Sequence, residues 1–183
     1  MEDLRRGKEL KLRQLLRLIV TLSIPAIAAQ ISTILMEYID ASMVGHLGAE
    51  SSAAIGLVAS TTWLFGGVGM SVGTGFTVQV AQLVGAGNDG KARNTVRTGL
   101  IFCLAVDMVL LLAGLAIHRV LPAWLGGNEE IREDASLYFL IYALAIPVAQ
   151  INRAAGGMLQ GSGNMKVPGI LHVVMCALDV IFN

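Results

Sequence analysis

Charged residues are scarce in this sequence. They make up 14% of its 183 residues, whereas a soluble domain carries about 25%. Hydrophobic residues account for 55%, and the mean hydropathy is +0.68. The 13 basic and 13 acidic residues cancel, so the net charge identifies no partner, and we expect no nucleic-acid partner. The composition excludes an ordinary soluble domain and predicts an all-α fold, a polytopic membrane helix bundle.

Cysteine is also scarce, and the motifs of common enzymes are absent. Cys103 and Cys176 lie far apart in apolar segments, which excludes a disulfide framework and favours inert thiols. The three histidines form no metal-binding motif, so we expect no metal site and no cofactor. Gly156 and Gly161 have the spacing of a phosphate-binding loop, but Ser162 stands where lysine is required. The sequence therefore gives no support for an enzyme.

The apolar residues fall into five segments that are long enough for membrane helices. These segments are residues 15–44, 53–84, 95–117, 135–159 and 167–183. Gly69 and Gly73 form a GxxxG pair in the second segment, which lets another backbone approach closely. We expect an acidic loop at residues 129–134 and an interruption of the fourth segment at Pro147. Because the sequence stops inside the fifth segment, we expect a fragment that is poorly stable alone.

The basic residues are distributed unevenly between the two ends of these segments. With a cytosolic amino terminus, the inner side carries eleven of the 13 Lys and Arg residues, and the outer side carries only Arg119 and Arg132. This excess predicts five spans with the N-terminus in the cytosol. We therefore divide the chain into a basic cytosolic tail, residues 1–17, and transmembrane helices one to five, residues 18–183.

The first apolar segment carries a lengthwise polar face. Its members follow helical spacing, and they are Ser23, Gln30, Thr33, Glu37 and Asp40. On a helix they lie within an arc of about 100° and extend over about 25 Å. Carboxylates inside a membrane are costly and normally face a bundle interior or a watery cavity. The segment therefore predicts partner helices and a polar cavity, and Pro25 should kink its helix.

The acidic residues of the segments are candidates for coupling to an ion. Glu37 and Asp40 lie one turn apart, and a buried carboxylate can bind H+ or Na+. In the fifth segment Asp179 and Asn183 also lie one turn apart, and the two pairs would converge on one cation site. The alternatives are hydration at the outer interface for the first pair and a structural hydrogen bond between helices for the second. Asp107 stands alone in the third segment, and we do not select it.

Four stretches together carry a resemblance to a known family. They are Pro25 with Gln30, DASMVGHLG at 40–48, AQLVGAGN at 81–88 and LQGSGNMKVP at 159–168. Each stretch alone is weak, but their order and their positions between the expected spans make the set specific. Nearly the whole chain after the basic tail resembles the amino-terminal part of a multidrug and toxic compound extrusion (MATE) transporter.

The resemblance implies a fold and an activity. It implies twelve helices in two lobes with alternating access, of which this truncated first lobe would supply four helices and part of the fifth. It implies export of drugs and organic cations, driven by inward H+ or Na+, by a multi-pass protein of a bacterial-type inner (plasma) membrane. Its other partners would be membrane lipid and the missing helices of the same transporter.

The resemblance also assigns roles to individual residues. An Asp on helix one is the central coupling residue of such transporters, and Asp40 matches it. Ion binding there would bend helix one at Pro25 and collapse a substrate cavity lined by Gln30 and Thr33. The helix-five pair of the family reads Asn and then Asp, whereas Asp179 and Asn183 have the reverse order. This departure leaves the coupling ion open.

Two other functions remain alternatives. A lipid-linked saccharide flippase of related fold would use more basic residues in its cavity, but here Lys and Arg lie toward the ends of the expected spans. A non-transporting scaffold subunit would use the polar faces only to hold helices together. Replacing Asp40 and Asp179 by Asn would then change assembly rather than flux.

Overall fold

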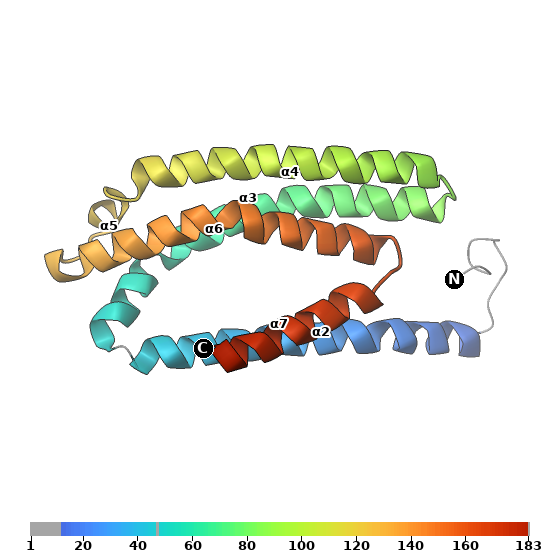
Figure 1. Cartoon of the computed structure of the whole chain (residues 1–183), viewed down its shortest axis with the longest axis horizontal. Coiled ribbons are helices and arrows are strands. Elements are labelled where there is room, and N and C mark those ends of the chain that lie inside the picture. The colour runs from blue at the N-terminus through green and yellow to red at the C-terminus, as the bar shows by residue number, and fades with distance from the viewer. Residues whose placement is uncertain (1–11, 47, 183) are drawn as a thin grey trace.

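The computed structural model describes residues 12–46 and 48–182, and this part of the chain is helical apart from short connections (Figure 1). Its long helices are α2 (Leu12–His46), α3 (Ala49–Gly85), α4 (Asp89–Ile117), α6 (Glu129–Gly161) and α7 (Lys166–Phe182). A one-turn helix, α5 (Leu121–Trp124), joins α4 to α6. No strand occurs among the described residues, and the predicted all-α fold class is confirmed.

Three of the helices, α3, α4 and α6, are each long and apolar enough to cross a membrane, and α7 contains a shorter apolar stretch. The polytopic membrane bundle that the composition predicts is thereby confirmed. α2 begins at Leu12, so the described part of the expected tail, residues 12–17, is already helical. The rest of that tail, residues 1–11, lies outside the described residues.

Two expected interruptions of regular structure are wrong, and both concern α6. The expected acidic loop forms the first turns of this helix, which begins at Glu129 directly after Asn128 in extended conformation. Carboxylates interact favourably with the positive end of a helix dipole, so an acidic run favours helix initiation. The helix also continues through Pro147 to Gly161. Proline is tolerated inside a membrane helix where neighbouring helices hold the segments on both sides of it.

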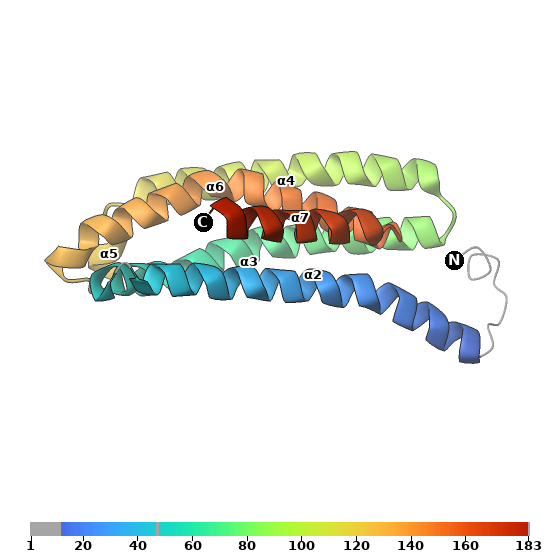
Figure 2. The same cartoon turned by 60° about the horizontal axis from the view of Figure 1, so that its bottom comes forward.

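The helices form two units (Figures 1 and 2). α3, α4 and α6 pack into a three-helix bundle, in which α3 runs antiparallel to α4 and parallel to α6. α2 and α7 pack against each other and run in the same direction. Contact between the units is slight and joins α2 to α3 and α7 to α6.

Small residues line the contact between α3 and α6. A Cβ atom added at Gly69 would lie 2.7 Å from Nε2 of Gln150, and one at Gly73 would lie 3.3 Å from Cβ of Ala154. Both glycines are buried. The close approach predicted from the GxxxG pair is therefore confirmed, and its partner is α6.

The interior of the bundle holds two apolar clusters. The first lies toward α5 and consists of Ala54, Val58, Phe65, Leu121, Ala135, Phe139 and Ile146. The second lies toward the turn between α3 and α4 and consists of Val80, Cys103, Ala154 and Met158. Large apolar side chains also cover the outside, where Trp63 is 81% exposed and Val148 is 77% exposed. An apolar exterior of this kind suits contact with lipid.

Candidate functional site

The polar face predicted from the sequence lies on α2, and its residues differ in exposure. The exposed members are Gln30, Glu37 and Asp40, and the half-buried members are Ser23 and Thr33. All of them lie on one uninterrupted helix, because α2 continues through Pro25. Figure 2 shows that α2 is bent in its N-terminal third. The role of Pro25 as a hinge remains a prediction.

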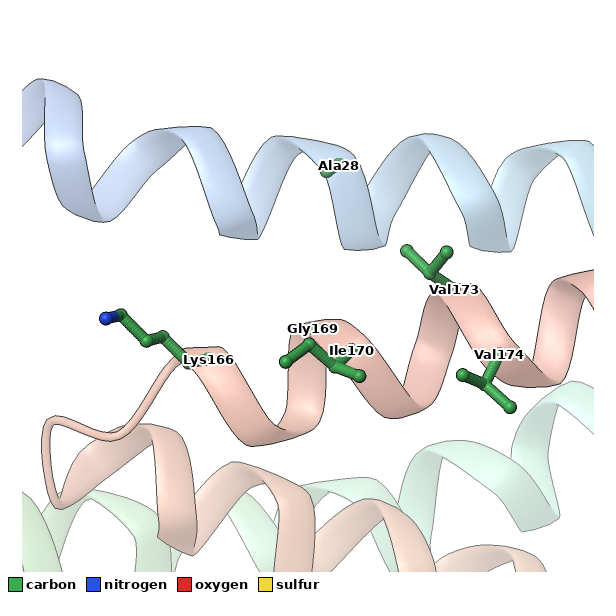
Figure 3. A pocket seen from close by; sticks show the side chains of 6 residues that line it. All are labelled: Ala28, Lys166, Gly169, Ile170, Val173 and Val174. Carbon is green, nitrogen blue, oxygen red and sulfur yellow. The ribbon is translucent and has the colours of Figure 1, made fainter.

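α7 lies beside α2 and shares a pocket with it (Figure 3). In this view Ala28 of α2 stands opposite the turn of α7 that holds Gly169 and Ile170. The two helices run in the same direction and rise equally per residue. Asp179 comes nine residues after Ile170, and Glu37 comes nine residues after Ala28. Asp179 therefore follows this level on α7 by as many residues as Glu37 follows it on α2.

The other member of the predicted pair on the fifth segment, Asn183, lies outside the described residues. The structure thus packs the two helices that carry the predicted pairs, α2 and α7, against each other. It does not test which side chains of α2 and α7 share an ion.

The pocket between α2 and α7 has a volume of about 360 Å³ and is almost entirely apolar. Its lining residues are Ala28, Lys166, Gly169, Ile170, Val173 and Val174. Lys166 is the one charged residue among them and lies at the end of the pocket near the turn between α6 and α7 (Figure 3). Gln30 and Thr33, the expected cavity residues, do not line this pocket.

A second polar position, which is not among the predicted site residues, lies inside the three-helix bundle. Asp107 on α4 is 1% exposed. Its Oδ1 atom would lie 3.1 Å from a Cβ atom added at Gly69, so the carboxyl group is directed at the backbone of α3. Neither carboxyl oxygen has a hydrogen-bond partner among the described residues. A buried polar group without a partner is rare and costly.

Gln150 on α6 reaches the same part of α3 as Asp107. It is 7% exposed, and its Nε2 atom donates a hydrogen bond to the backbone oxygen of Gly66 at 2.8 Å. The same amide nitrogen is the nearest atom to a Cβ added at Gly69. We call Asp107 and Gln150 the central polar pair. Along all three helices the pair lies between the two apolar clusters.

The sequence contained one signal for this site. Any ionisable residue in an apolar segment is a functional candidate, and Asp107 is the only acidic residue in the apolar part of its segment. No spacing rule could have paired it with Gln150, because the two residues lie on different helices. Among the described residues no group of three or more His, Cys, Asp and Glu side chains could hold a metal ion.

Comparison with known proteins decides the family. A family model described as MatE matches residues 25–183. The chain belongs to the MatE family. The resemblance found in the sequence is thereby confirmed, and the MatE match covers all the helices described above except the start of α2.

Relatives of this MatE chain carry names that refer to transport. The "Probable multidrug resistance protein NorM" of Neisseria meningitidis serogroup B is 30% identical over 170 residues, which cover 91% of this chain and 36% of the relative. A protein of the same name from Agrobacterium fabrum is 29% identical over 164 residues, 87% of this chain and 34% of the relative. The "FAD transporter" of Shewanella oneidensis is 20% identical over 167 residues, 91% of this chain and 37% of the relative. No solved structure matches the chain.

The MatE membership and the apolar helices together define a multi-pass membrane protein of a family of transporters rather than enzymes. The chain spans about a third of the length of the curated relatives it matches. It therefore corresponds to a part of the first lobe that the resemblance implies, and the described helices supply both units of that part.

Proposed function

We propose that this MatE protein is an antiporter that exports drugs and organic cations in exchange for inward H+ or Na+. The observation that carries the proposal is the match of residues 25–183 to the MatE family, together with relatives named multidrug resistance proteins. The protein acts in a bacterial-type plasma membrane with its N-terminus in the cytosol. Its other partners are lipid and the remaining helices of the transporter, and it needs no cofactor besides the coupling ion.

Asp40 is the coupling residue in this proposal. Binding of a cation neutralises its carboxylate and lowers the cost of placing this part of α2 in apolar surroundings. α2 then bends at Pro25 and closes the cavity that Gln30 and Thr33 line, and the substrate leaves on the outer side. Each net charge that moves inward supplies about 2.3 kcal/mol per 100 mV, which corresponds to a substrate gradient of roughly fiftyfold. For an exported monovalent cation this requires two inward charges, because the first only balances the charge of the substrate.

The packing of α7 beside α2 supports an ion site that both helices share. Glu37 follows Ala28 on α2 by nine residues and Asp179 follows Ile170 on α7 by nine residues, so in this proposal both helices carry an acidic residue at one depth. Acidic residues at one depth raise the affinity for a cation between them, because each carboxylate makes ionisation of the other less favourable. Asn183, one turn further along the chain, would add an amide oxygen to the same site.

The test is efflux of a fluorescent organic cation from cells that make the full-length protein. The wild-type protein should lower the accumulation of the dye, and Asp40→Asn should reduce efflux at least tenfold because the amide cannot exchange a cation. Glu50→Gln is the matched control, since Glu50 is an exposed carboxylate in the first turn of α3, and it should retain efflux. Normal efflux by Asp40→Asn would refute the role of Asp40.

The relative named FAD transporter suggests a second candidate substrate. FAD carries phosphate groups, and a cavity for it would need basic residues to balance them. The central parts of the described helices offer none, since Arg97 and Arg153 lie toward the ends of α4 and α6. We therefore favour organic cations. Export of flavin by a wild-type protein that exports no cationic dye would favour the second candidate.

A further inference from the structure

The centre of the three-helix bundle contains a carboxyl group that the proposed coupling site does not use. Asp107 of α4 is 1% exposed, and both of its carboxyl oxygens are buried without a hydrogen-bond partner among the described residues. Apolar clusters lie above and below it along the bundle. An ionised carboxylate in such surroundings costs several kcal/mol unless a partner compensates the charge.

No helix of the bundle directs a compensating charge at Asp107. On α3 the only charged residue is Glu50, in the first turn, and the residue that meets Asp107 is Gly69. On α6 the residue at this level is Gln150, which is neutral, and the nearest basic residue in sequence, Arg153, is exposed. On α4 itself Arg97 lies ten residues away, about 15 Å along the helix. The nearest titratable group on α4 is the thiol of Cys103, which is buried one turn before Asp107.

A metal cation is a poor fit to this position. Calcium and magnesium take about six or more oxygen ligands, whereas no group of three or more His, Cys, Asp and Glu side chains among the described residues could hold a metal ion. The amide nitrogen of Gln150 is turned toward α3 and donates to Gly66. A single proton, in contrast, removes the whole charge and needs only one acceptor for the resulting O–H group. The amide group of Gln150 lies against the same glycine as Asp107, and its oxygen can accept such a hydrogen bond.

We propose that Asp107 is a proton-binding site of the α3–α4–α6 bundle, separate from the polar face of α2. The carboxyl group is un-ionised while the three helices are packed together. It loses its proton only when α4 separates from Gly69 and Gln150 far enough to admit water. Proton release from this site is thereby linked to opening of the bundle. The proposal does not rest on the proposed export function.

The experiment is infrared spectroscopy of the full-length protein in lipid vesicles at pH 7, with the aspartate carboxyl carbons labelled with 13C. An un-ionised carboxylic acid has a carbonyl stretching band that a carboxylate lacks, and the label identifies it as aspartate. The band should be present in the wild-type protein and in Asp134→Asn, a control at an exposed position in α6. In Asp107→Asn the band should be weaker, because the contribution of Asp107 to it is missing.

Three results would overturn the proposal. The first is a wild-type spectrum with no un-ionised aspartate at pH 7, and the second is a spectrum that Asp107→Asn leaves unchanged. The third is loss of the Asp107 band on addition of Na+ at constant pH, because that result assigns the site to sodium. If Asp107→Asn fails to fold, Asp107→Glu is the second variant. It keeps a carboxyl group at this position but does not carry the aspartate label, so the labelled band of Asp107 should again be missing.

A second measurement separates proton binding from a merely structural role. If the folded bundle holds the proton and the unfolded chain releases it, the unfolded state binds fewer protons, and stability falls as the pH rises. Between about pH 5 and 7, the equilibrium constant for unfolding should rise with pH more steeply in the wild-type protein than in Asp107→Asn. The difference in slope should be up to a factor of about ten per pH unit. Equal pH dependence of the two proteins would contradict proton binding at Asp107.

Discussion

At the scale of single residues, two hydrogen bonds tie α6 to the backbone of α3. The Tyr142 hydroxyl donates to the backbone oxygen of Thr62 at 2.7 Å, and Nε2 of Gln150 donates to that of Gly66 at 2.8 Å. Tyr142 and Gln150 are eight residues apart, so their side chains project toward α3 just over two turns apart. Such bonds between membrane helices contribute about 0.6 kcal/mol on average and up to about 2 kcal/mol.

Tyr142→Phe should therefore lower the stability of the protein. The variant keeps the ring and its stacking on Phe139 but removes the donor to Thr62. We expect a loss of about 0.5–1 kcal/mol, measured as a lower midpoint of thermal unfolding in detergent. Tyr138→Phe is the matched control, because Tyr138 lies on the same helix and is 38% exposed. An equal loss in both variants would contradict a specific bond from Tyr142.

The two candidate sites differ in how far single residues could be identified from the sequence. Gln30, Thr33, Glu37 and Asp40 could be grouped because they lie on one helix, where periodicity alone sets the shared face. The central polar pair could not be grouped this way. Asp107 and Gln150 reach the same glycine of α3 only because of the register between α4 and α6, which depends on how their small residues pack. That register is a property of the folded bundle.

At the scale of elements, glycines set how closely the helices approach. A Cβ atom added at Gly114 of α4 would lie 2.7 Å from Cβ of Ala143 on α6. Because Ala143 has no flexible side chain that can move away, the two backbones would have to separate. Without a hydrophobic driving force between helices in lipid, close packing of this kind is a main source of association.

Gly114→Ala should accordingly weaken the contact between α4 and α6. We expect a loss of about 1–3 kcal/mol, the usual cost of forcing an extra carbon into a packed interior. Gly75→Ala is the control: nothing lies within 4 Å of the added Cβ on α3, and alanine favours a helix by up to about 1 kcal/mol over glycine. Unfolding midpoints in detergent should therefore shift in opposite directions. A shift of the same sign and size in both would contradict the packing described.

The elements themselves were largely predictable, and the errors share a cause. The five long helices follow the five apolar segments, because a membrane helix needs about twenty apolar residues, which are easy to recognise. The polar residues around Glu129 and Glu130 suggest a loop, but carboxylates also suit a helix N-terminus, and α6 begins there. Pro147 suggests an interruption, but its effect depends on neighbouring helices. Polar residues and proline therefore predict the ends of a helix poorly where neighbouring helices pack around it.

At the scale of the whole molecule, the described chain consists of two units that touch each other only slightly. The pair of α2 and α7 carries the polar face and the pocket, and the bundle of α3, α4 and α6 carries the central polar pair. Slight contact allows the pair to move relative to the bundle, as the proposed alternating access requires. With so little contact between the units, residues 1–183 alone should be poorly stable. A cooperative thermal melt of this monomer in detergent would contradict that expectation.

The parallel packing of α2 and α7 can be tested by cross-linking in the full-length protein. Ala28→Cys and Val173→Cys introduce thiols on two walls of one pocket, in a background in which Cys176 is replaced by Ser and the buried Cys103 is kept. A short bifunctional thiol reagent should join them efficiently. Ala28→Cys with Val148→Cys is the matched control, because Val148 is 77% exposed on α6, in the other unit.

Cross-linking also tests whether α2 moves along α7 during export. If α2 bends at Pro25 in each cycle, a link at Ala28 holds it against α7, and efflux of the cationic dye should fall at least tenfold and recover when a cleavable link is reduced. If the link between α2 and α7 forms and efflux stays normal, the two helices move together. The hinge would then have to lie outside the part of α2 that contacts α7. Equal linking of the Ala28 and Val148 pair would contradict the separation of the two units.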